Sequence, residues 1–165
     1  IGRSGSEVVG RLILEGDYEG AAHTMLVLSE GNALLRIRAA SWKEALFHPE
    51  FRHDLKFNIE KWQSFLWNAL LLEKIGNGLP ARLPIWGPDA DNREIYRHLW
   101  NPATLDADAL RLVHQWSRST MVEPANLRAG RKPRGWEVCF DLPPGCYATV
   151  VLERLFKLEE PGRRL

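Results

Sequence analysis

The residues best placed for chemistry lie at a change of hydrophobic period near the C-terminus. Trp136, Val138 and Phe140 are separated by more polar residues, an alternation that predicts a half-buried strand over residues 136–142. After a Pro-Pro-Gly corner, apolar residues recur at i, i+3, i+4 and i+7, which predicts a helix. Tyr147 stands at this junction, beside the free N–H groups of the helix's first turn. It could present an aromatic ring to a ligand, although a purely structural capping aromatic explains the same pattern.

A second candidate site is a basic cluster just before this strand. Its members have no acidic residue between them, and they are Arg128, Arg131, Lys132 and Arg134. Clustered cations are the electrostatic footprint of phosphate binding, but they are also typical of a solvated loop. The segment is interpreted as a basic linker; a solvated loop is the more common case, and contact with RNA phosphates is the alternative. The net charge of the whole chain, +1, does not by itself favour a polyanionic partner.

Other catalytic and metal-binding patterns are missing from the sequence. The histidines show no paired zinc spacing, and Cys139 and Cys146 fit neither a zinc site nor a disulfide framework. There is no Gly-x-Ser-x-Gly elbow and no phosphate-binding glycine loop. We therefore expect no metal, no cofactor, and no nucleophile or general base in this chain. The two cysteines and the lack of a secretory signal or membrane span indicate a reduced, cytoplasmic setting.

The strongest predicted element is a long helix over about residues 56–75. It is apolar almost all round, which is typical of a helix inside a core. Ser64 and Asn68 lie four residues apart on one face, so they must either form internal hydrogen bonds or line a wet cleft. We expect them to brace the structure. Trp86, in the proline-rich segment 80–88, is expected to pack against this helix rather than stack on a base.

The remaining helices are predicted to be short. In the first half of the chain, each is expected to begin directly after a capping residue. Two more helices are expected over residues 92–100 and 106–117, and in the second of these Trp116 is expected to face inward. A short strand is expected near residues 120–122. The side chains predicted to cap helices are Ser4, Asp17, Ser41 and either Thr104 or Asp106.

These elements predict an α+β chain that is mostly helical. We expect a helical domain over residues 1–127 and a strand-turn-helix over residues 128–165. A single strand does not make a stable sheet. We therefore expect strand 136–142 to pair with chain outside this sequence, with a second copy, or with the helical part.

Four segments carry a family resemblance. Residues 142–149 read Leu-Pro-Pro-Gly-Cys-Tyr-Ala-Thr and precede a hydrophobic helix with an arginine near its end. Residues 61–68 read Lys-Trp-Gln-Ser-Phe-Leu-Trp-Asn, and residues 118–127 follow an Arg-x-x-x-x-x-Pro-x-x-Leu pattern. The fourth segment is the opening Gly-Arg-Ser-Gly-Ser-Glu with a later Val-Gly. Taken in their order along the chain, the four segments resemble the TruD family of tRNA pseudouridine synthases over nearly the whole chain.

The resemblance implies a cofactor-free isomerase that converts a uridine in tRNA to pseudouridine, at position 13 in bacterial members. It implies that residues 1–127 are the helical insertion domain and that residues 128–165 complete the catalytic sheet. Gly145, Cys146 and Tyr147 match the residues that bind the flipped uridine. Cys146 replaces the family's serine, a weaker hydrogen-bonding side chain. The implied partner is tRNA, which the insertion domain would help to clamp.

One part of the family pattern is missing. The nucleophilic aspartate lies in a Gly-x-Lys-Asp segment, which this sequence lacks. Since the chain also opens with isoleucine, we expect that segment in a missing N-terminal half and expect this chain alone to be inactive. The alternatives are a non-catalytic helical module that binds RNA or protein, and an unrelated helical interaction domain. Nothing in the sequence indicates an oligomeric state.

Overall fold

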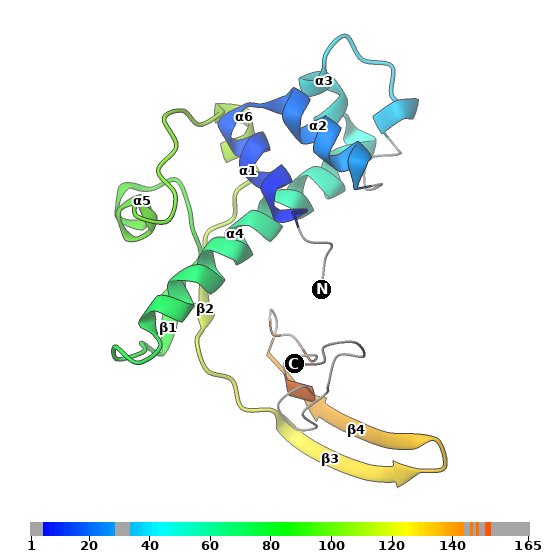
Figure 1. Ribbon diagram of the computed structural model, residues 1–165, viewed down its shortest axis with the longest axis vertical. Coiled ribbons are helices and arrows are strands. Elements are labelled where there is room, and N and C mark those ends of the chain that lie inside the picture. The colour runs from blue at the N-terminus through cyan, green and yellow to red at the C-terminus, as the bar shows by residue number, and fades with distance from the viewer. Residues whose placement is uncertain (1–4, 29–33, 144–145, 147, 149–150, 153–165) are drawn as a thin grey trace, which may run out of the picture. The chain divides into compact units, whose positions relative to one another are not determined.

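The computed structural model describes residues 5–28, 34–143, 146, 148 and 151–152 (Figure 1). The chain divides into two compact units, residues 1–118 and 119–165, and each is described by itself. The first unit contains helices α1 to α6, and the second contains an antiparallel strand pair. The predicted α+β class is therefore confirmed.

Three helices build the centre of the first unit. Helix α1 (Glu7–Glu15) packs along α4 (Arg52–Lys74), and α2 (Tyr18–Val27) packs against α1. Gly10 makes the α1–α4 approach possible, because a Cβ atom there would overlap the carbonyl oxygen of Asn58. The remaining helical segments are α3 (Trp42–Leu46), α5 (Ala90–Tyr96), α6 (Ala107–Leu110) and the 3₁₀ turns Leu34–Arg36 and Pro49–Phe51.

Three predicted caps are confirmed. Asp17 accepts a hydrogen bond from the Gly20 N–H at 2.9 Å, and Ser41 accepts one from the Glu44 N–H at 3.2 Å. Asp106 accepts from two N–H groups at the start of α6, at 2.9 and 3.0 Å. These bonds satisfy donors that a helix's first turn leaves free. Ser4 lies outside the described residues.

Helix α4 is confirmed, beginning four residues before the predicted start. Its inner side lies in the core with Trp86, which is 1% exposed as expected, and with Trp100. The ring centroids of Trp86 and Trp100 are 4.7 Å apart. The expectation of burial all round is wrong. Apolar side chains that are 46–70% exposed recur along one face and just beyond the last turn, and we call them the α4 stripe: Phe57, Phe65, Leu72 and Ile75.

The region after α6 differs from its prediction. The helix expected over residues 106–117 ends at Leu110, because the Trp116 carbonyl oxygen instead accepts a hydrogen bond from the Ile85 N–H at 2.8 Å. The two bonded residues flank β1 (Arg82–Pro84) and β2 (Ser117–Ser119), which pair with each other. Strand β2 replaces the strand expected near residues 120–122. Trp116 is 41% exposed rather than inward.

The second unit contains an antiparallel ribbon (Figure 1). Strand β4 (Gly135–Asp141) confirms the predicted strand, and it pairs with β3 (Ala125–Lys132). The basic linker is therefore a strand, and within the described structure β4 pairs with β3 rather than with the helical part. Pairing with chain outside this sequence or with a second copy stays a prediction. A register irregularity near Asn126, where φ is 53°, interrupts the regular alternation that would have revealed β3.

Candidate nucleic-acid interface

The predicted uridine pocket is described only in part. Gly145 and Tyr147 lie outside the described residues. Cys146 is half-buried with a free thiol, and its N–H donates to the Pro143 carbonyl oxygen at 3.3 Å. The described residues 148, 151 and 152 are helical. This agrees with a strand-corner-helix arrangement, while the role of the three residues remains a prediction.

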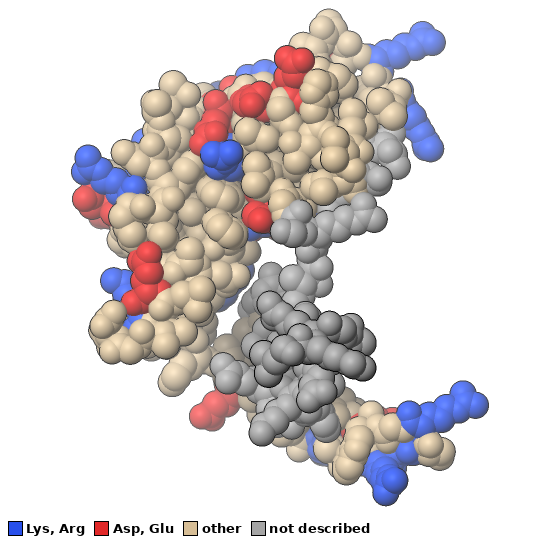
Figure 2. All heavy atoms as spheres, viewed as in Figure 1, with Lys and Arg blue, Asp and Glu red and all other residues tan. Residues whose placement is uncertain are grey.

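The four predicted phosphate-binding cations lie on the ribbon. Arg128, Arg131 and Lys132 belong to β3 and Arg134 to the turn, and all four are exposed. Figure 2 shows Lys and Arg side chains gathered at the free end of this ribbon. Among the residues that the structure describes, the three arginines make no ion pair, whereas Lys132 lies 3.4 Å from the Glu137 carboxylate.

The cations do not form a single patch, because the strand alternates its side chains between two faces. Arg131 is registered opposite Trp136, so these two side chains share one face of the ribbon. Arg128 and Lys132 lie on the other face, together with Glu137. The sequence pattern placed the four cations together but could not reveal this division.

Trp136 is a functional candidate that sequence reasoning missed. Its place in the alternating pattern suggested an inward side chain, but it is 62% exposed. Four other tryptophans of the chain are at most 8% exposed. An exposed indole that shares a ribbon face with an arginine offers a surface on which a planar ligand can stack.

The segment 61–68, which lies on α4, has a structural role. Gln63 is fully buried, and its side-chain amide donates to the carbonyl oxygens of Trp86 at 2.7 Å and His114 at 2.9 Å. Ser64 accepts a bond from Arg118 at 3.5 Å, and its bracing role stays a prediction. Asn68 is exposed instead.

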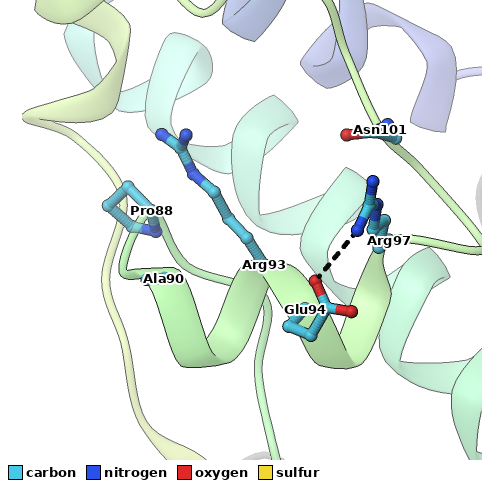
Figure 3. A pocket seen from close by; sticks show the side chains of 6 residues that line it. All are labelled: Pro88, Ala90, Arg93, Glu94, Arg97 and Asn101. Atoms are coloured by element: carbon cyan, nitrogen blue, oxygen red, sulfur yellow. Dashed lines mark hydrogen bonds and ion pairs between the residues drawn. The ribbon is translucent and has the colours of Figure 1, made fainter.

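A shallow pocket of about 370 Å³ lies beside α5 (Figure 3). Arg93 projects from this helix, and Arg97, the residue directly after it, lies 3.5 Å from the Glu94 carboxylate. The pocket is completed by Pro88, Ala90 and Asn101. It holds none of the residues predicted from the sequence.

The most perturbed carboxylate is structural. Burial opposes ionisation of Asp106, but bonds from the Ala109 N–H and from the Lys43 ammonium, 3.1 Å away, outweigh this and lower its pKa to about 2. Lys43 also lies 2.8 Å from Asp108, so it joins α3 to α6. This cluster joins two helices and does not line the pocket beside α5.

No group of three metal-ligating side chains occurs among the described residues. Over the same residues, every helix is too short or too polar to cross a membrane. Comparisons with models of protein families, with curated proteins and with solved structures gave no match. The case for a function therefore depends on this chain's own residues and geometry.

Proposed function

We propose that this chain is the C-terminal part of a tRNA pseudouridine synthase of the TruD type. In this proposal it binds tRNA and supplies one side of the pocket for the reacting uridine. The observation that carries the proposal is the segment directly after β4. The strand ends at Asp141, Leu-Pro-Pro-Gly-Cys-Tyr-Ala-Thr follows, and residue 148 is already helical.

A strand-to-helix corner suits the reaction's first requirement, which is to hold a flipped base. In the proposal, the ring of Tyr147 stacks on the uracil while backbone groups of Gly145 and Cys146 shape the pocket floor. Such stacking contributes about 1–3 kcal/mol per base. The exposed cations of the ribbon add attraction for the tRNA backbone.

The bond-breaking group comes from elsewhere in this proposal. An aspartate in a Gly-x-Lys-Asp segment promotes cleavage of the uridine N-glycosidic bond. The freed uracil turns over, and a carbon–carbon bond to the ribose replaces the carbon–nitrogen bond. No cofactor is needed, and the residues of this chain bind and orient the base.

The test is to express the complete reading frame that encodes this chain in a bacterial strain lacking its own position-13 enzyme. Pseudouridine is then mapped in tRNA by carbodiimide modification and primer extension. We expect a stop at position 13 with the complete frame and none with residues 1–165 alone. Tyr147→Ala in the complete frame should abolish the stop while the protein remains soluble.

A soluble product of the complete frame that leaves tRNA unmodified at every uridine would overturn the proposal. If that product still bound tRNA, the chain would instead be the non-catalytic RNA-binding module. The exposed basic ribbon is the observation that favours this second candidate.

A further inference from the structure

The free end of the β3–β4 ribbon combines exposed cations with an exposed indole. The ribbon, residues 125–141, carries four cations and only two carboxylates, both in its last five residues. Its other distinctive side chain is Trp136, the most exposed tryptophan among the described residues. Charge and exposed aromatic surface therefore meet at one end of one element.

The strand register determines which of these groups act together. Arg131 and Trp136 are directly opposed, so their side chains lie on the same face, next to the turn that holds Arg134. The one ion pair of the described ribbon joins Lys132 to Glu137 on the opposite face. The guanidinium of Arg131 is thus free of a described carboxylate partner, and it belongs to the residue registered opposite Trp136.

This arrangement fits single-stranded RNA better than a duplex. In a duplex the bases stack on one another, so an indole on a flat ribbon has no base face to contact. In an unpaired segment each base exposes a face, and stacking on aromatic side chains is the usual way that proteins bind it. Cations alone would attract both forms through their phosphates.

We propose that Trp136 stacks on an unpaired base of RNA while Arg131 and Arg134 contact the flanking phosphates. The inference rests on the proposed function only in taking RNA as the ligand. It adds a second base-binding position that lies outside the predicted uridine pocket and that distinguishes unpaired from paired RNA.

The experiment compares binding of the full chain to a short oligouridylate and to an RNA duplex of similar length, by fluorescence anisotropy of labelled RNA. Trp136→Ala should weaken oligouridylate binding by roughly 5- to 150-fold and leave duplex binding unchanged. Trp136→Phe should restore most of the loss, because phenylalanine keeps a stacking face. Trp116→Ala is the matched control, since this tryptophan is also exposed but lies outside the basic ribbon.

A second readout tests the role of Arg131. Arg131→Gln should reduce the slope of log affinity against log salt by about 0.7 for oligouridylate, the change expected from one lost phosphate contact. Trp136→Ala should leave this slope unchanged.

Equal oligouridylate affinity of Trp136→Ala and the parent chain, with unchanged circular dichroism, would overturn the inference. Equal losses on oligouridylate and duplex would also overturn it, because they would assign Trp136 to general folding of the ribbon. These outcomes are independent of pseudouridine formation by the complete frame. Either proposal can therefore fail while the other stands.

Discussion

Gln63 shows how one buried side chain can hold three segments together. Its amide donates to carbonyl oxygens at residues 86 and 114, so it connects α4 to two segments that are distant in sequence. Neither carbonyl oxygen belongs to a regular helix or strand pair, so a side-chain donor is what satisfies them. Buried polar groups of this kind are costly when left without a partner.

We expect Gln63→Leu to destabilise the chain by about 1–3 kcal/mol. The substitution leaves one buried and one partly buried carbonyl group without this donor, and the removal of the unsatisfied Gln63 carbonyl oxygen offsets only part of that cost. Urea unfolding followed by circular dichroism measures the difference. Ser64→Ala, which removes one longer bond, is the control and should cost less. Equal stability of Gln63→Leu and the parent would contradict the bracing role.

Asp106 predicts an acid-sensitive contribution to stability. Its pKa is about 2 in the folded chain and about 3.8 when unperturbed, so the folded chain binds fewer protons between these values. The stabilisation is therefore present above about pH 4 and is lost as the pH falls through 2. Asp106→Asn keeps a capping side chain but removes the charge. The melting temperatures of parent and variant should differ at pH 5 and converge near pH 2, and a constant difference would contradict this account.

Local interactions explain which residue-scale predictions were confirmed. Asp17, Ser41 and Asp106 cap helices that begin within three residues of them, so their partners could be read from the neighbouring sequence. The partners of Gln63 lie 23 and 51 residues away, and no local pattern identifies them. The exposure of Trp136 has the same origin, because it depends on what covers the ribbon.

At the scale of elements, the ribbon is expected to be the least protected regular structure. Two-stranded ribbons are marginally stable by themselves. Every residue of β3 is exposed, and so are all but two residues of β4. Hydrogen exchange followed by mass spectrometry should show ribbon amides exchanging roughly 100-fold or more faster than those of the buried side of α4. Equal protection of the two elements would contradict this expectation.

The element predictions succeeded where the hydrophobic period is strong and uninterrupted. Helix α4 and strand β4 were predicted nearly in full, because each keeps one period along its length. Strand β3 was missed because its cations and its irregular register hide the alternation. The helix expected over residues 106–117 was shortened by a distant contact, the bond between Ile85 and Trp116. For the candidate site, the sequence indicated the cations but not their division between two faces.

At the scale of the whole molecule, the two units suggest that the chain can be divided. Met121, between β2 and β3, is 78% exposed, and the segment 120–124 belongs to no helix or strand. We expect brief thermolysin treatment to give a stable fragment that ends near residue 120 and keeps the helical circular dichroism signal. Met121→Asp should slow its formation, because thermolysin cleaves beside apolar residues. A fragment that loses its helical signal would show that the first unit needs the second in order to fold.

The α4 stripe bears on how any of these melting temperatures should be recorded. Because four large apolar side chains remain in water when the chain is folded, environment-sensitive dyes such as anilinonaphthalene sulfonate should fluoresce brightly before heating begins. In a dye-based melt the fluorescence would then start from a high baseline, so the increase on unfolding would be small. Melts followed by intrinsic absorbance or ellipticity would not have this problem. Replacing Phe65 with Ser and Leu72 with Gln should lower the dye fluorescence of the unheated sample without lowering its helical content.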